Sequence, residues 1–372
     1  MKILIVCTSV SWGGLEQIAL RDAVELKKRG QDVHVLGMDR GVLCEKIKET
    51  DLIYHSARNQ NKYFNFELIS KLRKIISAFG IEVIHLHTFN TIFPVLFAVR
   101  HIKVKVFATR HIHVEHVKKD IFHRWYLGRL DKLFAISEFA RNNLIQTYPL
   151  PPEKIQTLYV GINVEHFKRT EQKREQFKKD FPHISQNDKI IGVIGRIDPM
   201  KGQLEFVESI PHILAQYPKT HFLIVGRPTA EKENIYMEFV KNRTREMGID
   251  NFITFTGFYE DVSIPLSAMD IFIMPSYFEA FGLIALQAMA CEVPVIATEK
   301  GSIDEVIPYE DYGIKILPQS NTAIATAVIK LLGNKDLTDH IKQKAYQRVK
   351  EIFDEKRYFD NLIRIYKQTL NC

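Results

Sequence analysis

The sequence has few of the features that mark disulfide-bonded, thiolate-metal or membrane-spanning proteins. Its 372 residues include only four cysteines, which are Cys7, Cys44, Cys291 and Cys372. They lie far apart and form no Cys-x-x-Cys pair, which argues against a disulfide framework or a thiolate metal site and favours a reducing cytosol. The longest apolar stretch, residues 92–99, contains Pro94 and is far shorter than the roughly 20 residues of a membrane span.

The N-terminus and the charge distribution exclude further classes of protein. The apolar residues 3–7 are followed directly by Thr8 and Ser9, so they are too short for the apolar core of a signal peptide. The 51 Lys and Arg outnumber the 44 Asp and Glu to give a net charge of +7, without the dense basic tracts of a nucleic-acid-binding protein. We therefore expect a cytoplasmic protein with no nucleic-acid partner, and peripheral contact with the inner face of the membrane stays open.

What the sequence does contain is an alternation of short β-branched runs with helical patterns. The expected strands of the first half are 2–7, 32–37, 51–55, 82–86, 103–109, 132–136 and 154–159. Helical periodicity fills most of the gaps between them, and the same alternation restarts at residue 189. Such alternation implies parallel sheets with helices on both faces, so we predict an α/β fold of two doubly wound, Rossmann-like domains facing each other across a cleft.

The same pattern sets the expected domain boundaries. Residues 1–165 form the first domain, and the polar segment 166–188 is expected to be a linker. Residues 189–353 form the second domain. The helical tail, residues 354–372, is expected to cross back to the first domain.

Three strand-to-helix connections carry residues that suit a nucleotide. The first is the segment 11–16, which contains Gly13 and Gly14. Paired glycines let the backbone approach a ligand closely, and the helix start offers free N–H groups to a phosphate. A tight turn without any ligand would explain the same pattern.

The second connection spans residues 192–202, where Gly195 precedes Arg196 and Lys201 follows a proline-containing loop. Two cations and a helix start at one strand end can neutralise a diphosphate without a metal ion. The P-loop pattern Gly-x-x-x-x-Gly-Lys-Ser/Thr is absent. Solvated loop charges are the alternative interpretation, which the neighbouring glycines disfavour.

The third connection spans residues 275–290. Glu279 lies in a loop after an expected buried strand, Gly282 opens the following helix, and Gln287 lies within that helix. A carboxylate and an amide could hydrogen-bond the hydroxyls of a sugar or a ribose, and the backbone at 281–283 would present N–H groups. Alternatively, Glu279 only complements the helix dipole.

Together these motifs make the chain resemble the retaining, nucleotide-sugar-dependent glycosyltransferases of the GT-B fold, glycosyltransferase family 4. The matching segments are Gly13-Gly14, Ile136-Ser137-Glu138, Gly161-Ile162-Asn163 with Phe167, Gly195-Arg196, Lys201-Gly202, Ile224-Val225-Gly226 and the stretch from Glu279 through Pro294-Val295. The resemblance implies an acceptor-binding first domain and a donor-binding second domain. It also implies a Glu-x7-Glu motif, in which the first Glu contacts the donor sugar and the second contacts the ribose.

The chain departs from that family pattern at three positions. Eight residues after Glu279 stands Gln287 in place of the second Glu, although an amide can still donate to and accept from ribose hydroxyls. Glu292 stands where the family usually has Gly, and Ser302 follows Gly301 where a second Gly is usual. These departures concern the donor site more than the fold.

The resemblance assigns the site residues. The catalytic residues would be Arg196, Lys201, Glu279 and His111, the last of which follows a strand at the family's position near the donor sugar. The donor-binding residues would be Gly13, Gly14, Gly195, Gly226, Gly257, Phe281, Gly282, Leu283 and Gln287. A zinc site of His111, His113 and His116 is disfavoured, because the spacing lacks cysteine partners and a His-Glu-x-x-His helix. No Asp-x-Asp occurs in the chain, so we expect neither a metal nor another cofactor.

By the same resemblance, we expect a metal-independent, retaining hexosyltransferase. It would move a sugar from a UDP- or GDP-linked donor to an acceptor hydroxyl, in the synthesis of cell-surface polysaccharide, lipopolysaccharide or glycolipid. The acceptor would be a sugar, a lipid-linked or another hydroxyl compound. Two alternatives stay open: a nucleotide-sugar epimerase of the same fold, and a non-catalytic nucleotide-binding protein, for which Gln287 is the only hint.

A basic surface is expected in the first domain. Its members are Arg100, Lys103, Lys105, Arg110, Lys118, Lys119, His123 and Arg124. Together with the apolar residues Phe122, Trp125, Tyr126 and Leu127, this surface would suit an anionic leaflet. The alternative is an ordinary amphipathic helix whose apolar side packs on its own sheet.

Overall fold

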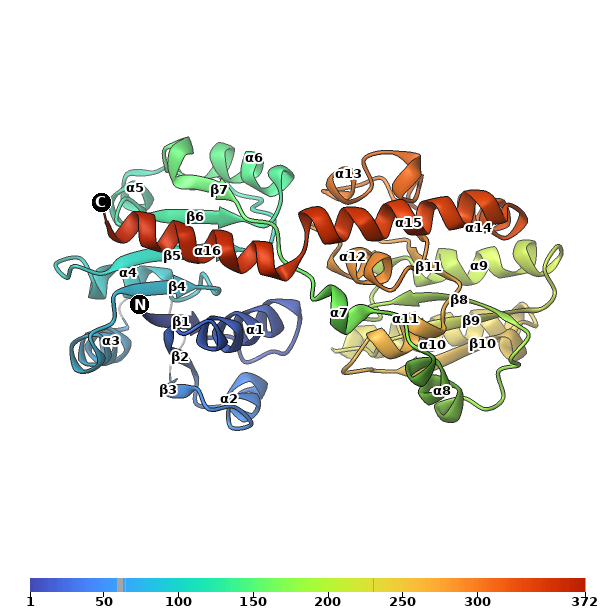
Figure 1. Ribbon diagram of the computed structural model, residues 1–372, viewed down its shortest axis with the longest axis horizontal. Coiled ribbons are helices and arrows are strands. Elements are labelled where there is room, and N and C mark those ends of the chain that lie inside the picture. The colour runs from blue at the N-terminus through green and yellow to red at the C-terminus, as the bar shows by residue number, and fades with distance from the viewer. Residues whose placement is uncertain (59–62, 64, 230, 372) are drawn as a thin grey trace. The chain divides into compact units, whose positions relative to one another are not determined.

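The computed structural model describes residues 1–58, 63, 65–229 and 231–371 (Figure 1). The chain divides into two compact units, one made of residues 1–159 with 358–372 and the other of residues 160–357. Each unit contains a parallel β-sheet flanked by helices. The prediction of an α/β fold with two doubly wound, Rossmann-like domains is confirmed.

The sheet of the first unit has seven strands in the order β3-β2-β1-β4-β5-β6-β7. The strands are β1 (Lys2–Cys7), β2 (Asp32–Met38), β3 (Ile53–Ala57), β4 (Val83–Leu86), β5 (Lys105–Arg110), β6 (Lys132–Ala135) and β7 (Ile155–Thr157). All neighbouring pairs are parallel. The order reverses between β1 and β4, which is where ligands of doubly wound sheets bind, beyond the carboxyl ends of the strands.

The helices of the first unit cover this sheet. They are α1 (Gly14–Lys28), α2 (Val42–Ile47), α3 (Phe66–Phe79), α4 (Ile92–Ala98), α5 (Ile121–Leu127), α6 (Glu138–Thr147) and α16 (Glu355–Leu370). From residue 358 onward, the C-terminal helix α16 belongs to this unit. Its residues Phe359, Leu362 and Tyr366 are fully buried in the same core as Ile3 and Ile5 of β1.

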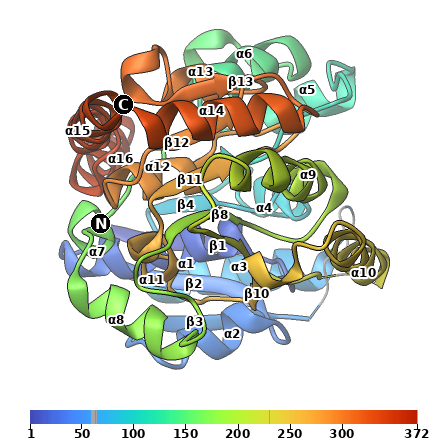
Figure 2. The same cartoon turned by 90° about the vertical axis from the view of Figure 1, so that its right-hand side faces the viewer.

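The sheet of the second unit has six strands in the order β10-β9-β8-β11-β12-β13. The strands are β8 (Lys189–Ile194), β9 (Thr220–Val225), β10 (Ile253–Gly257), β11 (Ile271–Met274), β12 (Val295–Thr298) and β13 (Ile314–Ile316). The helices are α7 (Val164–Phe167), α8 (Glu171–Asp180), α9 (Gln203–Leu214), α10 (Glu231–Glu246), α11 (Ser263–Ala268), α12 (Leu283–Ala290), α13 (Ile303–Val306), α14 (Asn321–Gly333) and α15 (Lys335–Ile352). Figures 1 and 2 show α9 and α14 side by side, and both contribute to one apolar core around Phe206 and Phe222.

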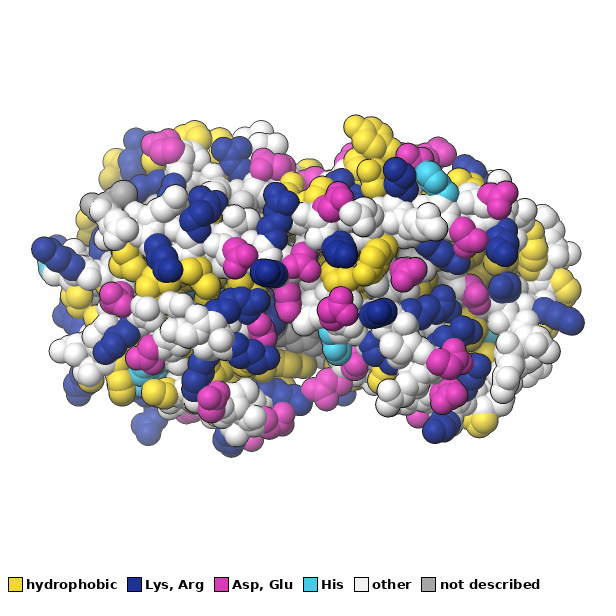
Figure 3. All heavy atoms as spheres, viewed as in Figure 1, with side chains coloured by type: hydrophobic (Ala, Val, Ile, Leu, Met, Phe, Trp, Pro, Cys, Tyr) yellow, Lys and Arg dark blue, Asp and Glu magenta, His cyan; other side chains and the backbone are white. Residues whose placement is uncertain are grey.

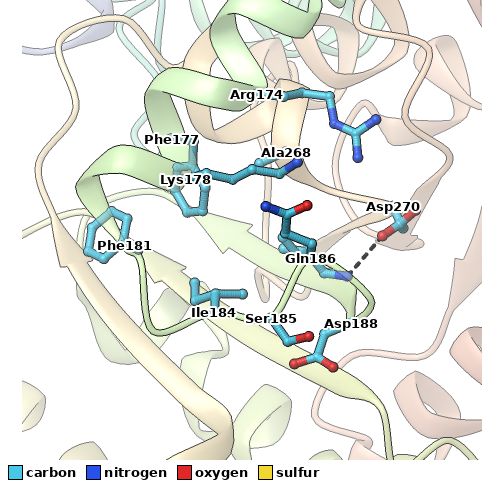
Figure 4. Close-up of a pocket in the computed structure, with 11 residues that line it drawn as sticks. Arg174, Phe177, Lys178, Phe181, Ile184, Ser185, Gln186, Asp188, Ala268 and Asp270 are labelled. Atoms are coloured by element: carbon cyan, nitrogen blue, oxygen red, sulfur yellow. Dashed lines mark hydrogen bonds between the residues drawn. The ribbon is translucent and has the colours of Figure 1, made fainter.

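The segment 166–188, expected to be a linker, is a packed part of the second unit. Helix α8 lies against α11, and Phe177 of α8 is fully buried. Figure 4 shows the small space beside α8, with Phe177, Lys178 and Asp270 around it. The Asp270 carboxylate accepts a hydrogen bond from the Ile190 N–H of β8 at 2.9 Å. This space has a volume of about 20 Å³, which is enough for a water molecule and too small for a nucleotide. The chain passes from one unit to the other at residues 159–160.

Within the described ranges, no helix combines the length and the apolar character that crossing a bilayer requires.

Candidate functional site

The predicted diphosphate-binding segment leaves the carboxyl end of β8. Its short helical turn, Pro199–Lys201, is followed by Gly202, whose φ of +70° is a left-handed conformation that glycine adopts without strain. A Cβ atom at Gly202 would lie 2.2 Å from the Pro275 carbonyl oxygen. Glycine at this position therefore lets the β8–α9 turn pass directly against the end of β11, which brings Lys201 to the loop that carries Glu279.

Lys201 and Glu279, predicted from different motifs, are in direct contact. The Lys201 Nζ lies 2.6 Å from the Glu279 Oε1, and the Ser276 hydroxyl donates to the same oxygen at 2.7 Å. Ser276 is buried, and the Glu279 side chain is 16% exposed. A partly buried carboxylate with one lysine and one hydroxyl donor is fixed in position, so a polar ligand would meet a preorganised pair.

Arg196 is held by two carboxylates that the sequence motifs did not identify. Its Nη2 lies 3.1 Å from the Asp198 Oδ2, and its Nε lies 3.6 Å from the Glu233 Oε1. Glu233 is only 3% exposed and also accepts from the backbone N–H and the hydroxyl of Thr229. The Arg196 side chain itself is 51% exposed, so its guanidinium can reach a ligand. Asp198 lies within the predicted diphosphate-binding segment, residues 192–202, whereas Glu233 lies in α10 and carries no local sequence signal.

The loop of Glu279 is fixed by its neighbour across the sheet edge. Glu279 forms an isolated parallel bridge with Gly301, and the Ser302 N–H donates to the Glu279 carbonyl at 3.1 Å. A Cβ atom on Gly301, whose φ is +82°, would lie 1.9 Å from that carbonyl oxygen. The first glycine of the family's Gly-Gly pair is therefore required by close packing, and the second position tolerates serine because the Ser302 hydroxyl donates to the Ala280 carbonyl at 2.7 Å.

Helix α12 follows this loop. The remaining predicted residues of the third connection lie in this helix or directly before it. Gly282 precedes the helix with a φ of +81°, Phe281 is buried, and Leu283 is the first helical residue. The first N–H groups of any helix have no acceptor within it. The Gln287 side chain is half-buried, and its amide makes no hydrogen bond with the described residues. Gln287 is therefore available to a ligand.

Three predicted donor-site glycines meet at the carboxyl edge of the second sheet. The Gly226 N–H donates to the Gly257 carbonyl at 2.8 Å, and the Gly195 N–H donates to the Val225 carbonyl at 2.9 Å. A Cβ atom on Gly226 would lie 1.8 Å from the Gly195 carbonyl oxygen. The structure thus brings Gly195, Gly226 and Gly257 together where β8, β9 and β10 end.

The remaining predicted residues lie in the first unit. Gly13 precedes α1, and its N–H donates to the Glu16 Oε2 at 2.8 Å. A Cβ atom on Gly14 would have nothing within 4 Å, so this position is open. Beside this turn lies a pocket of about 280 Å³ at the reversal point between β1 and β4. It is lined by Ser9, Val10, Ser11, Leu15, Glu16, His87, Thr88, Phe89, Asn90, Arg110, His111 and Ile112.

His111 lies in this pocket at the end of a buried polar chain. Its Nε2 lies 3.2 Å from the His87 Nδ1, and the His87 Nε2 lies 3.7 Å from the buried Asp22. Tyr358 of α16 donates to the same carboxylate at 2.6 Å, and Arg21 pairs with it at 2.8 Å. Burial lowers the pKa of both imidazoles to about 3, so they are neutral near pH 7.

The sequence motifs do not reveal most of this row of polar side chains. His87 lies at the end of a predicted strand, but Asp22 and Tyr358 lie within helical patterns that carry no functional motif. The histidines at 113 and 116 do not join His111. His113 instead lies 3.3 Å from the Asn143 amide. Within the part of the chain that the structure describes, no group of three His, Cys, Asp or Glu side chains is placed to hold a metal ion.

Comparison with known proteins decides the family. Residues 12–166 match the family model described as Glycosyltransferase Family 4, and residues 173–348 match the one described as Glycosyl transferases group 1. The chain belongs to glycosyltransferase family 4. The first model covers most of the unit that contains His111, and the second covers the stretch with Arg196, Lys201 and Glu279.

Named relatives are similar to this glycosyltransferase along its length. It is 25% identical over 395 residues to the N-acetyl-alpha-D-glucosaminyl L-malate synthase of Bacillus anthracis, covering 100% of this chain and 97% of that protein. It is 24% identical over 368 residues to the capsular polysaccharide biosynthesis glycosyltransferase CapM of Staphylococcus aureus, covering 94% of both.

Solved structures share the fold of this glycosyltransferase. A glycosyltransferase from Rickettsia africae has a TM-score of 0.88 at 23% identity, covering 99% of this chain and 98% of that one. Anabaena Alr3699/HepE, solved with UDP and glucose, has a TM-score of 0.84 at 19% identity and 99% coverage of both chains. At such identities the likeness concerns the fold, which is the GT-B type.

Proposed function

We propose that this glycosyltransferase moves a sugar from a nucleoside-diphosphate sugar to an acceptor hydroxyl with retention of the anomeric configuration. The observation that carries the proposal is the direct contact of Lys201 with Glu279. Two residues predicted for the diphosphate and the sugar come from separate motifs and meet at one sheet edge, 2.6 Å apart. The neighbouring half-exposed Arg196 adds a second cation to the same β8–α9 connection.

In this mechanism the cations act on the leaving group. The bond between the anomeric carbon and the β-phosphate oxygen breaks, and negative charge develops on the departing diphosphate. Lys201 and Arg196 stabilise that charge, a contribution that is often the largest single term in catalysis. Both cations are already oriented by carboxylates, Lys201 by Glu279 and Arg196 by Asp198 and Glu233. Little reorganisation is then needed when the diphosphate arrives.

The other predicted residues position the donor. Glu279 accepts hydrogen bonds from sugar hydroxyls, and the free amide of Gln287 binds ribose hydroxyls. Backbone N–H groups at Gly282-Leu283 reinforce the phosphate site. The acceptor oxygen forms the new bond to the anomeric carbon on the face that the diphosphate leaves, and its proton passes to a donor phosphate oxygen, so no protein nucleophile is required.

The donor and acceptor classes follow from relatives. Anabaena Alr3699/HepE has been solved with UDP and glucose and with UDP-glucose, which supports a UDP-linked donor here. A capsular polysaccharide relative supports an acceptor in cell-surface glycan synthesis. The absence of an Asp-x-Asp motif, together with the fixed cations Arg196 and Lys201, supports a reaction that needs no metal.

The proposal is tested in two steps with the full chain. Thermal shift with UDP, GDP and their sugars first identifies the nucleotide, because a saturating ligand raises the melting temperature by mass action. The stabilising donor is then incubated with candidate acceptors, and proton NMR follows the anomeric signal. An α-linked product from an α-linked donor supports retention. A β-linked product refutes it, and conversion of the donor to its epimer without transfer identifies the epimerase alternative.

A further inference from the structure

Arg110 is a cation for which the described part of the chain provides no anion. It ends β5 and borders the pocket of the first unit, immediately before His111. Among the described residues it forms no ion pair, and its buried Nε has no hydrogen-bond partner. Two other partly buried arginines of this unit do find carboxylates: Arg21 pairs with Asp22 and Arg129 pairs with Asp131. Arg110 therefore differs from its neighbours in leaving its charge unmatched.

The surroundings fix the guanidinium without neutralising it. Its Cζ lies 4.8 Å from the centre of the Phe89 ring, which holds the group by a cation–π contact. Burial lowers the pKa of Arg110, yet an arginine stays protonated in proteins. Keeping an unpaired, half-buried charge costs folding free energy. A ligand that supplies the missing anion would recover that free energy as binding.

The rest of the pocket supplies hydrogen-bonding groups of a complementary kind. Ser9, Ser11, Thr88 and Asn90 line it with hydroxyl and amide groups, and His111 adds a neutral imidazole. Its one carboxylate, Glu16, accepts from the Gly13 N–H at 2.8 Å and makes no ion pair with Arg110. A space of about 280 Å³ suits a small hydroxylated molecule or the end of a larger one.

We propose that this pocket binds the acceptor through a carboxylate or phosphate group held by Arg110. The acceptor hydroxyl to be glycosylated would lie beside that anion, among the polar side chains. A guanidinium suits either group because its parallel N–H donors match two anionic oxygens at once. The role of this ligand as the acceptor rests on the proposed function. Binding of an anion to the pocket can be measured without any transfer reaction.

The test is calorimetric titration of the full chain saturated with the nucleoside diphosphate that stabilises it. The probes are L-malate, glycerol 3-phosphate and neutral glycerol. Wild type should bind at least one of the two anions and should not bind glycerol measurably, and the preferred anion identifies the group. Arg110→Met should weaken that binding about ten-fold or more, and Arg110→Lys should lie between. Melting curves of both variants verify that they are folded.

Arg100 provides a matched control, since it is also a first-unit arginine over a phenylalanine ring, Phe97, at 5.4 Å. Arg100→Met should leave anion binding unchanged. Equal anion affinity in wild type and Arg110→Met overturns the proposal, as does the absence of binding by both anions to wild type. If Arg110→Met instead loses the nucleoside diphosphate, Arg110 belongs to the donor site and the proposal is also wrong. Failure of sugar transfer with intact anion binding would refute only the proposed function.

Discussion

At the residue scale, the proposed donor site depends on charges whose partners lie far away in the sequence. Lys201 and Glu279 were each identified from a local motif, but their 2.6 Å contact depends on the turn at Gly202 passing the end of β11. Glu233, which pairs with Arg196, lies in a helix with no motif at all. Local patterns therefore reveal residues suited to the chemistry, and only the fold reveals which carboxylate orients which cation.

Replacing Lys201 with Ala removes a cation that we place on the leaving diphosphate. Turnover should fall about 100-fold or more, as it does when a charged transition-state contact is lost. The matched control is Lys241→Ala, because Lys241 has similar exposure, 29% against 30%, and also pairs with a glutamate. Steady-state kinetics with the identified donor decide the matter. Equal turnover in the two variants would remove Lys201 from the mechanism.

Gln287 should tolerate a carboxylate better than an apolar side chain. Gln287→Glu restores the family residue and should preserve activity, whereas Gln287→Leu loses ribose hydrogen bonds of about 1 kcal/mol each. Because the amide has no partner among the described residues, the substitution leaves no protein group unsatisfied. Calorimetry with the nucleoside diphosphate alone measures the difference. Unchanged affinity in the leucine variant would show that Gln287 does not contact the ligand.

At the scale of elements, the strands were predictable and the packing of segment 166–188 into the second unit was not. Strand 2–7 matches β1, and strands 32–37 and 82–86 match β2 and β4 within one residue, because continuous β-branched runs identify strands buried on both faces. Segment 166–188 is mostly polar, which indicated a linker. A single buried side chain, Phe177, is enough to dock α8, and one apolar residue in a charged helix gives a weak periodic signal.

His87 follows β4 and His111 follows β5, and the pKa of each is lowered by burial. We therefore expect the stability of the first unit to fall in acid. The folded-state pKa of His87 is about 3 against an ordinary 6.5, so protonation favours the unfolded chain. The stabilisation is complete above pH 6.5 and is lost as the pH falls toward 3, by up to about 1.4 kcal/mol per pH unit. His87→Gln should therefore reduce the slope of unfolding free energy against pH in urea titrations between pH 6.5 and 4. An unchanged slope would assign the acid sensitivity to other groups.

At the scale of the whole molecule, the positive charge is widely distributed. On the face drawn in Figure 3, basic side chains are interspersed with acidic ones. Helix α5 has apolar residues on both its buried and its exposed side. Tyr126 and Leu127 are buried, as in an ordinary packed helix, while Ile121 is 87% exposed and Trp125 is 54% exposed. Each of the two interpretations of this helix therefore describes part of it.

The exposed side of α5 predicts recruitment to anionic membranes. Vesicles containing an anionic lipid should carry the protein upward in a flotation assay, neutral vesicles should not, and added salt should release it. Ile121→Ser with Trp125→Ser should reduce recruitment, whereas Ile235→Ser, at a 70% exposed position of α10, should not. Protein that stays unbound with anionic vesicles at low salt would identify these charges as a solvated surface.

The metal independence that we propose concerns the whole reaction, and the charges around the proposed donor site supply its physical reason. A divalent cation would need carboxylates left free to bind it. The carboxylates described here are already engaged: Glu279 binds Lys201 and Ser276, and Glu233 binds Thr229 and lies beside Arg196. In the proposed mechanism the fixed cations, with the helix dipoles, provide the positive charge that a metal would otherwise bring. Transfer should therefore continue in excess EDTA with less than about a two-fold change, because Arg196 and Lys201 would balance the charge of the diphosphate without a metal. The control is a chelated reaction resupplied with magnesium or manganese, which should run at the same rate. Loss of transfer in EDTA with recovery on adding either ion would contradict the roles proposed for Arg196 and Lys201, since the metal would then supply the neutralising charge.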